Sequence, residues 1–112
     1  MSTIIKSIDT KRGMLFEVEA GGKAVRIMLT WHALEGACDY NTSANDLLNF
    51  LIHPDEVIRG HGDRFIAHKR LNRHLARVVY EYENGSIVVV TFYIAYAERY
   101  FKGGMYEDKI LP

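Results

Sequence analysis

A cluster of basic side chains occupies the stretch FIAHKRLNRHLARVVYEY, residues 65–82. Its members are His68, Lys69, Arg70, Arg73, His74 and Arg77. The 112-residue chain as a whole is neutral, with 14 Lys and Arg residues against 14 Asp and Glu residues. Arginine can hold a phosphate through two parallel hydrogen bonds, and histidine can transfer a proton near neutral pH. The cluster therefore predicts a site for an anionic ligand that contains phosphate.

Cleavage of RNA by its own 2′-hydroxyl group needs few protein groups. One group takes the 2′ proton, one stabilises the charge of the pentavalent phosphate, and one protonates the leaving 5′ oxygen. Arg77 and Lys69 are of the types that stabilise this charge, and His68 and Tyr93 are of the types that transfer protons. These four are our candidate catalytic residues.

Charge is segregated along the chain. Residues 35–56 contain five acidic residues and no Lys or Arg, whereas residues 59–77 contain six Lys and Arg residues and one acid, Asp63. Such an asymmetry is typical of a surface that binds an anionic ligand. The alternative is that the two segments form solvated faces that complement each other within the fold.

The N-terminal part of the chain is predicted to contain two or three strands and then two helices. The strand segments are TIIKSI, MLFEVEA and KAVRIMLT, residues 3–8, 14–20 and 23–30, with Gly21 and Gly22 as turn residues. Thr30 can cap a short helix over residues 31–40, and Ser43 begins a capping box for a second helix. Pro54 disfavours helical backbone at the preceding residue, so this helix should end near Ile52.

Three further strands are predicted after a connecting loop over residues 53–63, in which Val57 and Ile58 can form a short extended piece. They are RFIAHKRL, HLARVVYEYE and SIVVVTFYIAY, residues 64–71, 74–83 and 86–96. The pair Asn84–Gly85 is a strong signal for a tight hairpin. The third strand is apolar on both faces at its start, so we place it in the middle of the sheet. The order of elements predicts an α+β domain in which two short helices pack on a curved antiparallel sheet.

The length of the chain predicts one domain, residues 1–112. Residues 1–29 would form a β-meander, residues 30–100 the core of the fold, and residues 101–112 a C-terminal tail.

A period of two assigns the strand residues to faces. Val88, Val90, Phe92 and Ile94 are predicted to face the helices, and Thr91 and Tyr93 the open side. Arg77 lies between the apolar Ala76 and Val78, so we place it on the same open face as Tyr93. The strand register, which the sequence leaves open, decides whether Lys69 or His68 joins them.

The words HALE, NFLIHPDEVI and RFIAHKRLN, followed by HLARVVYEYENGSIVVVTFY, resemble a small prokaryotic domain family that is grouped with the RelE/ParE and BrnT toxins. The resemblance covers roughly residues 30–100. It implies a fold of a helix pair and a sheet, and an endoribonuclease that acts on free or ribosome-bound RNA. It also implies an antitoxin partner, an acidic or amphipathic chain that covers the basic face.

The resemblance favours His32, Lys69, Arg70 and Arg77, Tyr93 or Tyr96, and Arg99 and Tyr100 beyond them. Around the candidate catalytic residues we assign RNA binding to His32, Arg70, Arg73, Tyr96 and Arg99. Each has a simpler alternative. His32 can be a helix-packing residue, Lys69 and Arg70 can protect a sheet edge, and tyrosine is common in strands. The alternative function is a non-catalytic module that binds protein or nucleic acid with the same fold, and a homodimer is a further possibility.

Cofactors, metals and membranes are not expected. Cys38 is the single cysteine, and the spacing of His61, Asp63 and His68 matches no standard ligand pattern. No apolar run approaches the roughly 18 residues of a membrane span. The N-terminus has an acid at Asp9 and no long apolar core, which argues against a secretory signal. We therefore expect a cytoplasmic protein.

Overall fold

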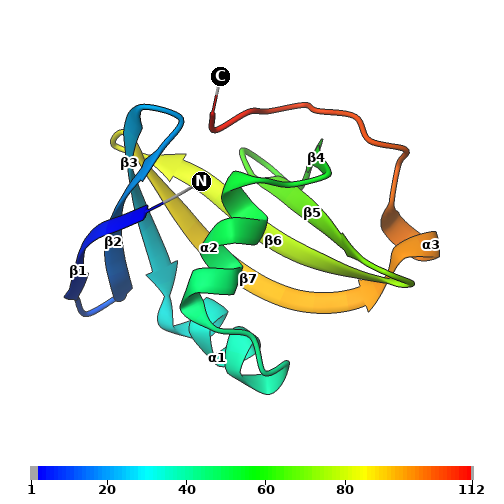
Figure 1. Ribbon diagram of the computed structural model, residues 1–112. Helices are drawn as coiled ribbons and strands as arrows, with labels where there is room; N and C mark the ends of the chain where they lie inside the picture. The colour runs from blue at the N-terminus through cyan, green and yellow to red at the C-terminus, as the bar shows by residue number, and fades with distance from the viewer. Residues whose placement is uncertain (1–2, 112) are drawn as a thin grey trace.

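Seven strands form one mixed sheet, and three short helices accompany it (Figure 1). The computed structural model describes residues 3–111. The elements are β1 (Thr3–Asp9), β2 (Gly13–Ala20), β3 (Lys23–Thr30), α1 (Trp31–Asp39), α2 (Ala44–Ile52), β4 (Glu56–Arg59), β5 (Phe65–Leu71), β6 (His74–Glu83), β7 (Ser86–Tyr96) and α3 (Ala97–Tyr100). The strand order is β1-β2-β3-β7-β6-β5-β4. The predicted α+β class is confirmed.

One neighbouring pair of strands runs parallel, so the prediction of a purely antiparallel sheet is wrong. β3 pairs with β7 in the parallel sense, through Ile27–Leu29 and Ile87–Val89. The hairpins and meanders on either side are antiparallel. The parallel pairing is possible because the connection is long. Two helices and three strands separate β3 from β7, and such a crossover can bring the chain back in the same direction.

Helices α1 and α2 cover one face of the sheet, as the sequence predicted. Thr30 and Ser43 cap them, because their hydroxyl oxygens accept hydrogen bonds from the backbone amides of Ala33 and Asp46. The buried face of α2 consists of Leu47, Leu48, Leu51 and Ile52. These side chains belong to one core with the inner faces of β2, β3, β5, β6 and β7.

Helix α1 lies against β7 where β3 ends. A Cβ atom at Gly36 would lie 2.3 Å from the backbone oxygen of Phe92, so only glycine permits this approach. The hydroxyl of Thr30 also donates a 2.8 Å hydrogen bond to the carbonyl of Val89. The first half of β7 therefore has a strand as its neighbour, and the next residues have a helix.

A β-bulge in β7 corrects the predicted assignment of faces. Val79 pairs with Thr91, but Tyr80 pairs with Val89, so Val90 is an extra residue. The helix-facing residues are accordingly Ile87 and Val89 before the bulge, and Phe92 and Ile94 after it. The prediction was right for the second pair. It was wrong for Val88 and Val90, which lie outside the core cluster.

The C-terminal tail, residues 101–111, wraps around the edge strand β4. The amide of Val57 donates to the carbonyl of Met105, and the amide of Glu107 donates to the carbonyl of Val57. Further along, Asp108 accepts hydrogen bonds from the hydroxyls of two tyrosines, and Ile110 is buried in the core. The tail thereby supplies the backbone partners that an edge strand otherwise lacks.

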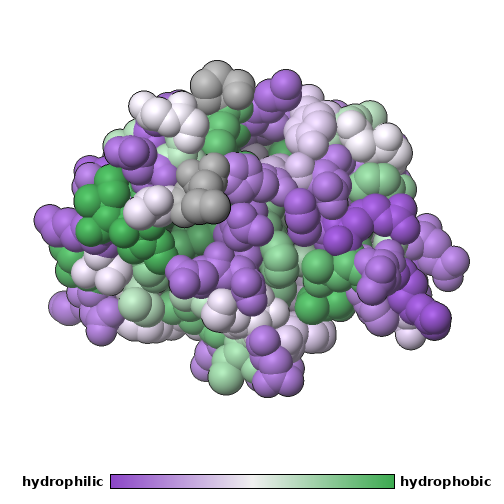
Figure 2. All heavy atoms as spheres, viewed as in Figure 1, coloured by the Kyte–Doolittle hydropathy of each residue, from purple (hydrophilic) through white to green (hydrophobic). Residues whose placement is uncertain are grey.

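The opposite edge of the sheet is bare. Every residue of β1 is exposed, and Ile4, Ile5 and Ile8 are among its exposed apolar side chains. Figure 2 shows hydrophobic atoms gathered at the left, over this region of the molecule. No helix within residues 3–111 has the length and apolar character to cross a membrane.

Candidate functional site

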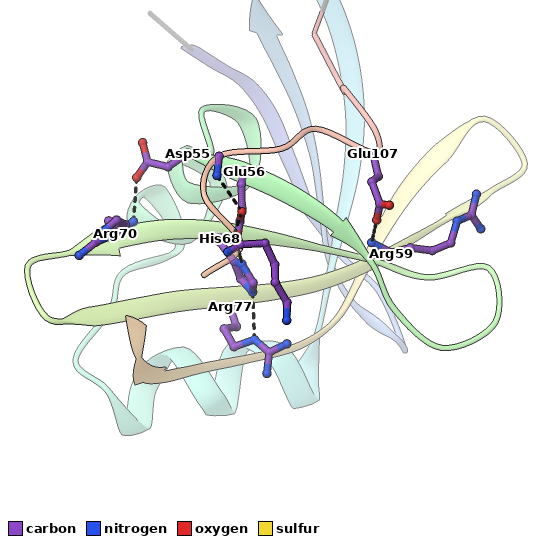
Figure 3. A network of polar contacts seen from close by, with 9 residues as sticks. Asp55, Glu56, Arg59, His68, Arg70, Arg77 and Glu107 are labelled. Atoms are coloured by element: carbon purple, nitrogen blue, oxygen red, sulfur yellow. Dashed lines mark hydrogen bonds and ion pairs between the residues drawn. The ribbon is translucent and has the colours of Figure 1, made fainter. Parts of the chain in front are cut away.

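Four polar side chains lie in a row across strands β4 to β7. Glu56 pairs with His68, His68 with Arg77, and Arg77 with Tyr93. Directly opposed residues on neighbouring strands point to the same face. Ala76 and Val78 belong to the core on the helix side, so Arg77 and its partners lie on the other face. We call these four residues the polar row, and Figure 3 shows three of them, Glu56, His68 and Arg77.

The polar row is joined by hydrogen bonds. Nδ1 of His68 lies 2.6 Å from Oε2 of Glu56, and Nε of Arg77 donates to Nε2 of His68 at 3.1 Å. Nη1 of Arg77 donates to the hydroxyl oxygen of Tyr93 in a short hydrogen bond. Because Nε2 accepts, the imidazole proton must be on Nδ1, where it is donated to Glu56. His68 is thus a neutral bridge between a carboxylate and a guanidinium.

The electrostatic environment supports these protonation states. Burial lowers the pKa of His68, and the positive charge of Arg77 lowers it further, against the opposing effect of Glu56. Burial by itself would raise the pKa of Glu56. Hydrogen bonds from His68 and from the tail amides outweigh it, so that the pKa of Glu56 lies below its usual value. Both shifts favour an ionised Glu56 beside a neutral His68.

The tail and α3 cover part of the polar row. The backbone amides of Lys102 and Gly104 donate to the carboxylate of Glu56 at 2.9–3.1 Å. The ring of Tyr100 lies on the guanidinium of Arg77, with Cζ 3.7 Å from the ring centroid. Glu56 and His68 are 0% exposed as a result, and Arg77 is 7% exposed.

The more exposed end of the polar row is therefore the pair Arg77 and Tyr93: Tyr93 is half-buried, and Arg77 keeps 7% of its surface exposed. The hydroxyl oxygen of Tyr93 accepts from Arg77, which leaves its own hydrogen free to be donated to a ligand. Nη2 of Arg77 makes no hydrogen bond within residues 3–111. These two groups together can bind one anionic oxygen each on the same phosphate.

Three of the four candidate catalytic residues come together in this site: Arg77, His68 and Tyr93. Lys69 does not join them, because it points to the helix face. Its ammonium group donates to the backbone carbonyl of His53 at 3.0 Å and lies 3.7 Å from Asp55. There it stabilises the C-terminal end of α2, where a positive charge is favourable. The strand register, which the sequence left open, pairs His68 with Arg77, so His68 and not Lys69 joins the site.

A groove lies around the end of β7, next to the polar row. It has a volume of about 610 Å³ and is lined by Tyr40, Leu71, His74, Tyr93, Ile94, Ala95, Tyr96, Arg99 and Tyr100. We call it the β7 groove. The rings of His74 and Tyr96 stack within it, with centroids 5.1 Å apart. Two residues of the predicted RNA-binding set, Tyr96 and Arg99, line this groove.

The rest of the predicted RNA-binding set is divided. Arg70 and Arg73 lie beside the β7 groove, in a hollow of about 390 Å³ that they share with Tyr96. His32 is exposed in the first turn of α1 and lines neither hollow. The set is therefore gathered on one end of the sheet, apart from His32.

Two residues of the site were not predicted from the sequence. Glu56 was assigned to a connecting loop, but it begins the short strand β4. His74 was placed in the basic cluster but in neither the catalytic nor the RNA-binding set, and its ring lines the β7 groove. The apolar pair Val57–Ile58 was the available signal for a strand that begins at Glu56. Within residues 3–111 no group of three or more His, Cys, Asp or Glu side chains is arranged to hold a metal ion.

Fold and site together define an α+β protein with a helix-covered mixed sheet, whose other face carries a buried carboxylate–imidazole–guanidinium row that ends at a tyrosine. Comparison with protein-family models, with curated proteins and with solved structures gives no match to this chain. Its function must therefore be argued from its own geometry.

Proposed function

We propose that this chain is an RNA-directed protein of the RelE/BrnT toxin type, which cleaves RNA without a metal ion. The observation that carries the proposal is the fixed guanidinium of Arg77. It is held by His68 and Tyr93 and covered by Tyr100, yet it keeps a donor free at the end of the polar row. A guanidinium held in place before the reaction stabilises a developing phosphate charge at little cost of reorganisation.

The reaction consistent with this site is transesterification. The 2′ oxygen of RNA bonds to phosphorus, the bond from phosphorus to the 5′ oxygen breaks, and a 2′,3′-cyclic phosphate remains. Arg77 stabilises the pentavalent phosphate, and Tyr93 donates its hydrogen towards the leaving 5′ oxygen. Both nitrogens of His68 are engaged, so it acts as a positioning residue for Arg77. His74 lines the same groove as Tyr93 from the opposite face of the sheet, and we assign its imidazole to take the 2′ proton.

The test is cleavage of end-labelled RNA by the purified protein, with and without ribosomes and in the presence of a chelator. Arg77→Ala should lower the rate by about 10²- to 10³-fold, the effect expected when one donor to a charged transition state is removed. Arg64→Ala is the matched control, because Arg64 is a surface arginine paired with Glu81. Undiminished cleavage by a folded Arg77→Ala protein would show that Arg77 has no part in the reaction.

A second candidate is a non-catalytic module that binds RNA or an antitoxin-like protein through the same face. The enclosure of Glu56 and His68 favours it, since two of the groups suited to proton transfer are closed to substrate. The discriminating variant is Tyr93→Phe, which keeps the ring and removes the hydroxyl. Affinity for RNA should be kept in this variant under either function, so the readout that separates them is cleavage. The ribonuclease should lose its rate, whereas a binding module cleaves no RNA with or without the hydroxyl.

A further inference from the structure

The second half of β7 has a free backbone edge. β3 pairs with β7 only as far as Val89. Beyond it, the backbone oxygen of Phe92 points towards α1, as its closeness to Gly36 shows. The amide of Ala97 points in the opposite direction, towards β6, because it donates a hydrogen bond to the carbonyl of Arg73 in the β5–β6 turn. Strand residues alternate in this respect, so the amide and carbonyl of Ile94 point away from β6. The carbonyl of Tyr96 is not free, because Tyr96 is the N-cap residue of α3 and its carbonyl accepts the first hydrogen bond of that helix.

These free backbone groups open into the β7 groove. Ile94 and Tyr96 both line it, and within residues 3–111 the outward amide and carbonyl of Ile94 have no hydrogen-bond partner. Tyr96 is 54% exposed and its ring stacks on His74. The groove therefore offers a flat aromatic surface beside an unpaired donor and an unpaired acceptor.

The surroundings of the β7 groove are suited to a nucleic-acid backbone. Arg99 lines the groove, and Arg70 and Arg73 lie in the hollow beside it. On the other side, Tyr93 and Tyr100 form part of its wall, and both contact Arg77. A chain of phosphates that passes the groove would meet arginine at both ends of its path.

We propose that the β7 groove holds one unpaired nucleobase of a single-stranded RNA. The base stacks on the outer face of the Tyr96 ring, whose other face is covered by His74, and its hydrogen-bonding edge meets the backbone amide and carbonyl of Ile94. The adjoining phosphate then lies at Arg77 and Tyr93. This inference rests on the proposed function and adds its substrate class: unpaired RNA, because a base already paired in a duplex has neither a free face nor a free edge.

A nucleobase fits the groove better than an extended peptide does. A peptide strand needs a long row of backbone partners, whereas within residues 3–111 only Ile94 offers both a free amide and a free carbonyl in this groove. Stacking on aromatic rings flanked by arginines is the usual means by which proteins hold unpaired bases. A volume of about 610 Å³ is also in the range of small-ligand sites.

The experiment measures binding separately from cleavage. Short fluorescent 2′-O-methyl oligoribonucleotides lack the attacking 2′-hydroxyl, so their anisotropy reports affinity alone. Tyr96→Ala should weaken binding of the single strand about tenfold, the loss expected for one stacked base. Tyr96→Phe keeps the ring and should bind as the wild type does. Tyr106→Ala, an exposed tyrosine of the tail outside the groove, is the matched control and should also bind normally.

Two results would overturn the inference: full affinity in a folded Tyr96→Ala protein, or equal affinity of the wild type for the single strand and for the corresponding duplex. Cleavage of unmodified RNA is scored independently. If binding depends on Tyr96 and no RNA is cleaved, the groove stands and the ribonuclease proposal fails. If RNA is cleaved and Tyr96→Ala cleaves it as well as the wild type, the ribonuclease stands and the groove fails.

Discussion

Two carboxylates, Glu56 and Glu83, show what burial does to similar chemistry. Glu83 forms a two-fold ion pair with Arg12, at 2.7 and 3.1 Å, on the surface near the N-terminal meander. Glu56 accepts hydrogen bonds from His68 and from two amides of the tail. Both carboxylates have a pKa below the usual value. Their side chains are 0% exposed for Glu56 and 40% exposed for Glu83.

The comparison teaches that good geometry is not the same as a large contribution to stability. The surface pair has the better ion-pair geometry, but water solvates both partners in either state, so it adds little. Removing any one partner of the buried carboxylate destabilises the fold, because no water can reach the carboxylate to replace that partner. We therefore expect the polar row, and not the surface pair, to dominate the response of the fold to mutation.

The largest expected effect is that of Glu56→Ala. It removes the acceptor of His68 and of the tail amides, and leaves these donors buried without partners. Loss of one partner from a buried charged network costs about 3–5 kcal/mol in the free energy of unfolding, which urea denaturation followed by circular dichroism can measure. Faster proteolysis of the tail should accompany it, because Glu56 anchors Lys102 and Gly104.

Glu56→Gln separates the effect of the lost charge from the effect of the lost hydrogen-bond acceptor. The amide keeps the size of the side chain and one acceptor oxygen but removes the charge, so its effect should be smaller than that of alanine. Equal stability of Glu56→Ala and the wild type would contradict the distinction between buried and surface carboxylates.

The fold could be predicted largely from local patterns. Thr30 and Ser43 cap the helices as expected, and Asn84–Gly85 forms the predicted turn with positive φ at both residues. Two features escaped the sequence. The bulge at Val90 leaves no mark in a run of four apolar residues, so alternation could not reveal the change of phase. The parallel pairing of β3 with β7 depends on how the crossover packs, which no local motif encodes.

The site could be predicted only in part, for a related reason. Arg77 and Tyr93 were placed on one face because their strand neighbours are apolar. The choice between His68 and Lys69 required the register, which depends on contacts between strands. Glu56 was missed because β4 has only four residues, and the tail amides that bind Glu56 lie 46 and 48 residues away in the sequence.

The next effect in size is the loss of stability in mild acid. The pKa of His68 is lowered in the folded protein, so the unfolded chain takes up this proton first, at its ordinary pKa of about 6.5. The contribution of neutral His68 is complete above that pH and is lost as the pH falls through it. The pKa of Glu56 is also lowered, so its contribution is complete above about pH 4.3 and is lost below.

Urea denaturation at a series of pH values from about 7 to about 4 tests this order, because that range contains the ordinary pKa values of both histidine and glutamate. The free energy of unfolding should fall between pH 7 and 5 in the wild type. His68→Gln removes the ionisable group and should flatten this part of the curve. An unchanged slope in the variant would mean that another group, and not the buried imidazole, causes the acid sensitivity.

The smallest expected effect is that of Glu83→Gln, which breaks the surface pair. Arg12 and Glu83 are 55% and 40% exposed, so each can be solvated when the other is changed. The melting temperature should stay within experimental error of the wild type, and added salt should reduce any residual difference, because exposed charges are screened. Arg12→Ala should behave in the same way. A loss as large as that of Glu56→Ala would mean that the pair fixes the β1–β2 turn against the β6–β7 turn. In that case geometry, and not burial, would decide the contribution of the two carboxylates.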